Sequence, residues 1–171
     1  MERVLQIINQ MQADGVVESY AIGDGIAAVY YIEPYHTDDI DIFIPVSAVT
    51  SSDSTLLSLD PIYSYLTKLG YTAVKEGVLI EDWLVQFIPA GESTQEEALL
   101  HAHTVRYGDT ETRIFSPEYL AAELLRSGRL KDYVRVEALI ESGKMDMDVF
   151  HELVRRHGLN DSWRKFTNAA E

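Results

Sequence analysis

Two neighbouring segments of the sequence indicate the fold. The first is Tyr20-Ala-Ile-Gly-Asp-Gly-Ile-Ala-Ala-Val-Tyr-Tyr31, and the second, from residue 37, is Thr-Asp-Asp-Ile-Asp-Ile-Phe-Ile. A short apolar run ends in the turn Gly23-Asp24-Gly25, and residues 26–32 have the composition of a short buried helix. A second apolar run then carries Asp39 and Asp41 two residues apart. This order predicts a strand, a glycine-rich turn, a helix and a second strand.

The two aspartates of the second run are the first candidates for chemistry. Alternate side chains of a strand share a face, so Asp39 and Asp41 are expected on one face and the neighbouring isoleucines in the core. Adjacent carboxylates repel each other unless a cation neutralises them, and magnesium prefers such oxygen ligands together with substrate phosphates. Backbone N–H groups of a glycine-rich turn before a helix can hold phosphate. The pattern indicates a metal and phosphate site, and the alternative is an exposed strand with two solvated acids.

The two motifs together resemble the nucleotidyltransferase superfamily, which has the fold of polymerase β. Its signature is an apolar residue, Gly, then Gly or Ser, a gap, and Asp-x-Asp on a strand. Here Ile22-Gly23-Asp24 stands for the first part, with Gly25 following, and Asp39-Ile40-Asp41 stands for the second. The resemblance implies an NTP substrate held at Gly23, Asp24 and Gly25, a Mg²⁺ or Mn²⁺ cofactor, and transfer to a hydroxyl acceptor. Asp24 departs from the small residue that is usual at its position.

Members of this superfamily usually supply a third carboxylate from a neighbouring strand. The corresponding strand in this chain is expected at residues 83–88, where Gln86 stands at the position of the acid. By resemblance, Asp39, Asp41 and Gln86 would hold the metal, Gln86 through its carbonyl oxygen. Two anions in place of three are expected to bind a divalent ion more weakly.

A second stretch, Gly128-Arg-Leu-Lys-Asp-Tyr-Val-Arg135, resembles the Arg-x-Lys-Asp segment of nucleotidyltransferase-like toxins from abortive-infection systems. Ser116-Pro-Glu-Tyr-Leu-Ala-Ala122 resembles the region before it, although Glu123 stands where those relatives often carry lysine. The resemblance implies that Lys131 faces the nucleotide phosphates and that Asp132 assists the acceptor or orients Lys131. The alternative is an ion pair at the start of a helix, with Lys131 solvated.

Composition limits the kinds of partner. The chain has 171 residues, a net charge of −14 and no cysteine. A protein this acidic is not expected to bind nucleic acid by general electrostatic attraction, and the sequence shows no evident DNA-binding surface. A small substrate, a metal-bound nucleotide or a basic partner protein fits the charge better. The absence of cysteine excludes disulfides and thiolate sites. With no signal peptide or apolar run long enough for a membrane span, we expect a cytoplasmic protein.

The pattern along the chain predicts an α+β fold: a small mixed sheet with flanking helices over residues 1–115, followed by a C-terminal helical bundle over residues 116–171. The predicted strands are residues 16–22, 39–46, 71–74, 83–88, 105–107 and 112–115. The predicted helices are residues 2–13, 26–32, 60–69, 94–103, 116–125, 130–140, 146–156 and 160–166, with a surface loop at residues 50–55. Thr94 and Glu97 have the spacing of a capping box.

Other polar residues are given structural interpretations. Asp146-Met-Asp148 repeats the Asp-x-Asp pattern, but its place after Gly143 predicts a helix cap and not a metal site. His101 and His103 lack a third ligand at zinc-like spacing and are expected at the surface or partly packed. His36 either reaches the aspartate site or is an ordinary loop residue.

Two functions fit these observations. The first is a metal-dependent nucleotidyltransferase that transfers NMP from an NTP to an unknown hydroxyl acceptor on RNA, protein or a small molecule. The second is a catalytically degenerate protein of the same fold that binds a nucleotide or a partner protein, in a toxin–antitoxin or regulatory pair. Gln86 and Asp24 favour the second.

Overall fold

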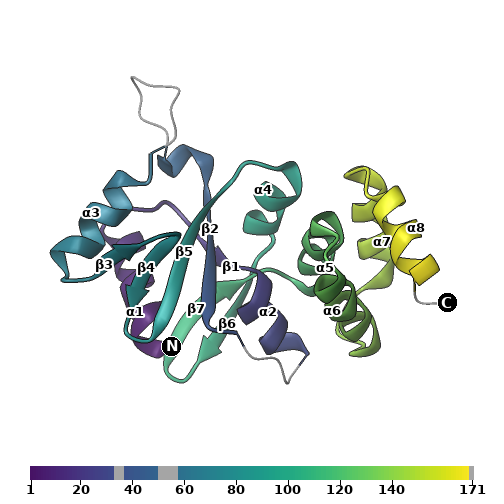
Figure 1. Cartoon of the computed structure of the whole chain (residues 1–171), viewed down its shortest axis with the longest axis horizontal. Coiled ribbons are helices and arrows are strands. Elements are labelled where there is room, and N and C mark those ends of the chain that lie inside the picture. The colour runs from purple at the N-terminus through teal and green to yellow at the C-terminus, as the bar shows by residue number, and fades with distance from the viewer. Residues whose placement is uncertain (33–36, 50–57, 170–171) are drawn as a thin grey trace.

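A seven-stranded sheet forms the centre of the computed structural model, which describes residues 1–32, 37–49 and 58–169 (Figure 1). The strands follow the order β3-β4-β5-β2-β1-β7-β6. Their bounds are β1 (Ala21–Ile22), β2 (Asp39–Pro45), β3 (Thr72–Val74), β4 (Gly77–Ile80), β5 (Trp83–Ala90), β6 (His103–Tyr107) and β7 (Thr110–Ile114). The sheet is mixed, because β2 runs parallel to β5 and antiparallel to β1, and β1 runs parallel to β7.

Helices flank this sheet and then form the C-terminal part of the chain. Their bounds are α1 (Glu2–Ala13), α2 (Asp24–Tyr31), α3 (Asp60–Lys68), α4 (Ser93–Leu100), α5 (Pro117–Ser127), α6 (Leu130–Glu141), α7 (Met147–Arg156) and α8 (Asn160–Ala169), with a 3₁₀ turn η1 (Val46–Val49). Figure 1 shows α5 to α8 gathered at one end of the sheet, and α5 contacts α2, α4, α6, α7 and α8. The predicted α+β fold with a C-terminal helical bundle is confirmed. None of the helices within the described ranges has the length and apolar character that crossing a membrane requires.

Local sequence explains most of these boundaries. Pro117 occupies the first turn of α5, and Gly128 ends the helix with a φ of 66°. Asp146 caps α7 by accepting hydrogen bonds from the N–H groups of Asp148 and Val149, so the prediction of a helix cap is confirmed. The capping box predicted at Thr94 and Glu97 was wrong, because the side chains of Glu92 and Gln95 form the capping box of α4.

Two predictions about strands were wrong. The strand expected at residues 16–22 pairs only over Ala21–Ile22, because turns and bends occupy the residues before it and Val17 is buried without joining the sheet. No strand was predicted between residues 74 and 83, yet this segment contains β4, in which Val78 and Ile80 are buried while Leu79 is exposed. Such alternation of buried and exposed residues is typical of a strand, but the charged residues around Gly77 made the segment resemble a loop. The loop predicted at residues 50–55 and His36 lie outside the described residues.

Strand β2 joins the core to the face that carries the aspartates. Ile40, Ile42 and Ile44 are fully buried, as the alternation predicted. Phe43 lies on the opposite face, and its ring centroid is 4.7 Å from that of Phe115, just before α5. This contact joins the sheet to the start of the helical part, beside the two aspartates.

Candidate functional site

The site is built around Asp39 and Asp41, which β2 places on one face of the sheet. Asp39 is partly exposed, whereas the side chain of Asp41 is buried, with 8% of its surface accessible. The parallel register of β2 and β5 pairs Asp41 with Gln86 and Asp39 with Leu84. Gln86 therefore lies beside Asp41, where the sequence placed the third ligand.

The side chain of Asp41 is largely buried and lies near other acids. Burial and the nearby charges of Asp24 and Asp39 raise the pKa of Asp41 to about 7, against the opposing influence of Arg129 and Lys131. Within the described ranges, no side chain or backbone group donates a hydrogen bond to this carboxylate. An added cation is the simplest way to stabilise such a charge.

The donor atoms present suit a hard divalent ion. Asp39 and Asp41 supply carboxylate oxygens, and the amide of Gln86 can supply a third oxygen without charge. Across the described part of the chain, no three His, Asp or Glu side chains gather closely enough to form a metal site of their own. A metal here would therefore depend on two acids and a neutral ligand.

The glycine turn packs directly against β2. The N–H of Gly23 donates to the carbonyl oxygen of Asp41 at 3.0 Å. A Cβ atom on Gly23 would lie 2.5 Å from the ring of Phe43, and one on Gly25 would lie 2.6 Å from Oγ1 of Thr37. Any side chain at these two positions would force the turn away from the aspartates, so both glycines are explained by packing.

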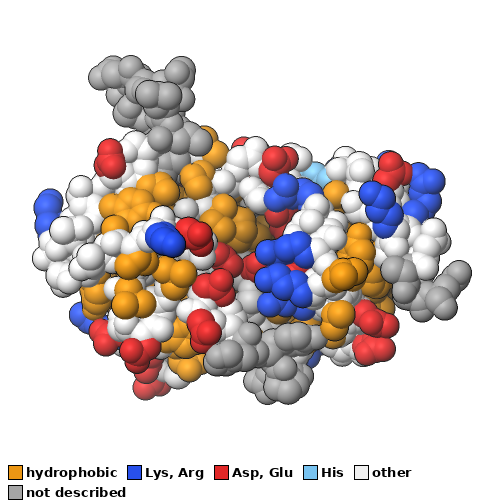
Figure 2. All heavy atoms as spheres, viewed as in Figure 1, with side chains coloured by type: hydrophobic (Ala, Val, Ile, Leu, Met, Phe, Trp, Pro, Cys, Tyr) orange, Lys and Arg blue, Asp and Glu red, His pale blue; other side chains and the backbone are white. Residues whose placement is uncertain are grey.

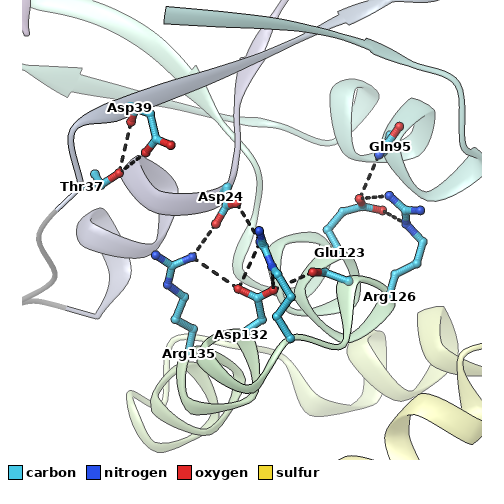
Figure 3. Close-up of polar contacts among 10 residues, drawn as sticks. Asp24, Thr37, Asp39, Gln95, Glu123, Arg126, Asp132 and Arg135 are labelled. Carbon is cyan, nitrogen blue, oxygen red and sulfur yellow. Dashed lines mark hydrogen bonds and ion pairs between the residues drawn. The ribbon is translucent and has the colours of Figure 1, made fainter. Parts of the chain in front are cut away.

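Thr37 links the turn to the aspartate pair. Its hydroxyl packs against Gly25 and donates to Oδ1 of Asp39 at 2.5 Å, a contact drawn in Figure 3. The hydrogen bond fixes the orientation of the more exposed of the two acids. Sequence reasoning missed this role, which a threonine two residues before a strand aspartate could have suggested.

Asp24, in the middle of the turn, is held by two arginines. Its carboxylate lies 2.5 Å from Nη1 of Arg135 and 3.2 Å from Nη2 of Arg129. Figure 3 shows Asp24 directed toward Arg135 and Asp132 on α6. Asp24 also has a φ of 37°, a conformation that costs a residue other than glycine about 1–3 kcal/mol. The predicted phosphate turn thus contains an acid whose charge is already paired.

Asp132 lies beneath this ion pair and is fully buried. Its carboxylate accepts from Oγ of Ser127 at 2.6 Å and from Nε of Arg129 at 2.5 Å, and Arg135 lies 3.5 Å away. A carboxylate with no exposed surface does not meet an acceptor directly. The burial of Asp132 is consistent with a role in positioning the neighbouring cations. A role of Asp132 in activity stays a prediction.

Lys131 lines a pocket of about 310 Å³ together with Asp39. The pocket is lined by Thr37, Asp38, Asp39, Leu84, Lys131 and Arg135. The side chain of Lys131 is exposed and forms no ion pair within the described residues. Figure 2 shows acidic side chains near the centre of this face and a group of Lys and Arg side chains directly beside them. The structure therefore brings the two predicted stretches, one from each half of the chain, to a single pocket.

Other candidates from the sequence lie away from this pocket. His101 is exposed and stacks on Tyr119, with ring centroids 5.4 Å apart. The hydroxyl of Tyr31 is buried and donates to the carbonyl oxygen of Phe115, whereas the side chain of Tyr30 is 50% exposed. Glu123, the position noted for lysine in relatives, accepts hydrogen bonds from Gln95 and Arg126, as Figure 3 shows.

The arrangement of strands and helices matches solved nucleotidyltransferase structures. No family model and no curated protein matches the sequence. An antigenic nucleotidyltransferase-like protein from Paracoccidioides brasiliensis matches with a TM-score of 0.59 and 16% identity, over 95% of this chain and 91% of the other. The structure of ANT(2'')-Ia in complex with adenylyl-2''-tobramycin matches with a TM-score of 0.55 and 15% identity, over 94% and 99%.

A solution structure of the antibiotic-resistance factor ANT(2'')-Ia matches with a TM-score of 0.51 and 16% identity, over 99% of this chain and 96% of that one. These matches extend over nearly the whole chain, and their low identities make them evidence about the fold. The protein has the nucleotidyltransferase fold, as the two sequence motifs predicted.

Proposed function

We propose that this protein is a metal-dependent nucleotidyltransferase that transfers a nucleoside monophosphate from an NTP to a hydroxyl acceptor. The observation that carries the proposal is the convergence of Asp39, Asp41 and Gln86 beside the Gly23–Gly25 turn, with Lys131 lining the same pocket as Asp39. The fold supports it, because solved structures of nucleotidyltransferases share it over nearly the whole chain.

Each group has a definite task in this proposal. Asp39 and Asp41, with Gln86, hold Mg²⁺ or Mn²⁺, which when bound activates the acceptor hydroxyl and stabilises charge on the phosphates. The N–H group of Gly23 is engaged by Asp41, so the backbone N–H groups of Asp24 and Gly25 bind phosphate oxygens at the start of α2. Lys131 neutralises the triphosphate, and Thr37 keeps Asp39 oriented. The reaction joins the acceptor oxygen to the α-phosphorus and releases pyrophosphate.

A second candidate function follows from Asp24. Its ion pairs with Arg129 and Arg135 place a satisfied acid where phosphate would bind, and Gln86 removes one metal-binding charge. A protein with these changes could keep the fold as a nucleotide- or protein-binding module, for example in a toxin–antitoxin pair. The two functions differ in whether metal and NTP bind together.

Calorimetry separates them. Each NTP is titrated into the protein with Mg²⁺, with Mn²⁺ and with neither, and the Asp39→Asn/Asp41→Asn double variant is measured in parallel. Asp161→Asn on α8 is the matched control, since Asp161 is an exposed acid paired only with its helix neighbour Arg164. The proposal requires binding that needs metal, disappears in the double variant and persists in the control. Absence of NTP binding by a folded protein would exclude the enzyme and favour a protein partner.

A further inference from the structure

Three adjoining hollows extend from the aspartate site along the molecule. The first is the 310 Å³ pocket of Asp39 and Lys131, called here the carboxylate hollow. The second, the middle hollow, has about 490 Å³ and shares Thr37 and Asp38 with the first. The third, the apolar hollow, has about 250 Å³ and shares four lining residues with the second: Met1, Ile26, Val29 and Tyr107. The shared lining residues place the hollows side by side, along a path that leads away from the candidate metal ligands.

The apolar hollow is suited to a hydrocarbon group. It lies between α1, α2 and the β6–β7 hairpin, and aliphatic side chains such as Leu5, Ile22, Ile26 and Ile114 form most of its wall. Arg106 and Thr112 are its polar members apart from the tyrosine hydroxyls. An apolar cavity of roughly 150 Å³ is enough to bind benzene in another protein. A volume of 250 Å³ accommodates an aromatic ring with a few further carbons.

The middle hollow is the acidic part of this path. Asp38 and Asp82 line the middle hollow, and Asp39 lines the carboxylate hollow. Trp83 and Tyr107 add aromatic faces to the middle hollow. A carboxylate or phosphate in the middle hollow would meet like charge, whereas an alcohol or an amine there would not. Cations line the two ends of the path: Arg106 lines the apolar hollow, and Lys131 and Arg135 line the carboxylate hollow, where the nucleotide phosphates are proposed to bind.

We infer that the acceptor is a small alcohol with an apolar or aromatic body and no anionic group. Its body occupies the apolar hollow, its chain crosses the middle hollow, and its hydroxyl reaches Asp39. This inference rests on the proposed function. In the transfer, the hydroxyl oxygen bonds to the α-phosphorus of the NTP, the bond to pyrophosphate breaks, and the hydroxyl proton is released to solvent.

Binding of phenylalkanols tests the inference without nucleotide. Benzyl alcohol, 3-phenylpropan-1-ol and 4-phenylbutan-1-ol are titrated into the ¹⁵N-labelled protein and followed by NMR. The affinity is expected to rise about fourfold with each methylene that becomes buried. The anion 4-phenylbutanoate is expected to bind at least tenfold more weakly than 4-phenylbutan-1-ol. Affinity that does not depend on chain length, or equal affinity for the anion, would overturn the inference.

Variants in the wall locate the bound ligand. Val29→Trp fills the junction of the apolar and middle hollows and is expected to weaken 4-phenylbutan-1-ol at least tenfold. Val149→Trp on α7, where Val149 is 45% exposed, is the matched control and should leave binding unchanged. Tyr107→Ala is a second variant whose residue is 51% exposed, so the fold tolerates its loss, and it should weaken binding several-fold. Unchanged affinity in both wall variants would contradict the assignment.

A label-transfer assay tests the acceptor inference separately from the proposed function. The protein is incubated with each α-³²P-labelled NTP, Mg²⁺ and either 4-phenylbutan-1-ol or tobramycin. Label on the phenylalkanol, and less of it with Val29→Trp, is the expected result. If NTP binds with metal but only tobramycin is labelled, the acceptor inference is overturned and the proposed function stands. If no NTP binds, the proposed function fails, and the inference fails with it.

Discussion

Substitution of Asp24 should move stability and nucleotide binding in opposite directions. In the wild-type protein Asp24 holds Arg129 and Arg135 at the start of α2. Asp24→Ser removes the acid from the proposed phosphate turn, so that Arg129 and Arg135 no longer contact a carboxylate there. We expect a less stable protein that binds NTP more tightly.

The structure sets the size of both effects. The contact with Arg129, whose side chain is 49% exposed, contributes at most about 1 kcal/mol. Arg135 is only 10% exposed, and removing one partner of a buried pair costs about 3–5 kcal/mol. Asp24 is itself 28% exposed and Asp132 stays 3.5 Å from Arg135, which reduces the loss to a total of about 2 kcal/mol. Charge-assisted bonds from Arg129 and Arg135 to phosphate should tighten NTP binding about tenfold, or about 1.4 kcal/mol.

Urea unfolding and calorimetry measure the two quantities on the same samples. Asp161→Ser is the matched control, because Asp161 pairs with Arg164 on the exposed surface of α8 and should change neither quantity. Equal or weaker NTP binding by Asp24→Ser would show that the arginines do not reach the triphosphate. Unchanged stability would show that the Asp24 ion pairs do not form in solution.

Three further predictions concern single side chains. Lys131→Ala should leave the free energy of unfolding within about 0.5 kcal/mol of wild type, since Lys131 is exposed, yet weaken NTP about tenfold in calorimetry. Gly25→Ala places a Cβ 2.6 Å from Oγ1 of Thr37 and should cost about 1–3 kcal/mol in urea unfolding; a neutral effect would show that the turn is mobile. Burial raises the pKa of the Tyr31 phenol, and the charges of Tyr30 and Glu118 raise it further. The stability that the neutral phenol contributes is therefore present below about pH 10 and is lost as the pH rises above that value. Tyr31→Phe should flatten that alkaline loss in thermal scans, and Tyr107→Phe, at a tyrosine that is 51% exposed, should not; equal slopes would contradict the burial of Tyr31.

Local patterns were enough to predict the main elements of the fold. The alternation in β2 correctly placed Ile40, Ile42 and Ile44 in the core, and Asp146 was correctly read as a helix cap. Those features depend on residues close together in the chain. The short β1 and the missed β4 show the limit, because pairing in a sheet depends on distant partners and not on the apolar run alone.

The sequence predicted which candidate ligands lie together, but it did not predict the ion pairs beside them. Asp39, Asp41 and Gln86 follow from motif spacing, and the β2–β5 register brings Asp41 and Gln86 together as expected. The contact between Asp24 and Arg135 joins residues 111 positions apart. Helical spacing links Asp132 to both arginines along the sequence, but nothing local indicates that they reach back to the glycine turn.

The most direct measurement of the central claim is paramagnetic broadening by Mn²⁺ in the NMR spectrum of the ¹⁵N-labelled protein, with and without NTP. A metal held by Asp39, Asp41 and Gln86 should broaden the amide signals of those residues and of the Gly23–Gly25 turn first, and NTP should strengthen the effect. The Asp39→Asn/Asp41→Asn variant should lose it. Broadening centred on other acidic surfaces, or unchanged in the double variant, would contradict the assignment of this site.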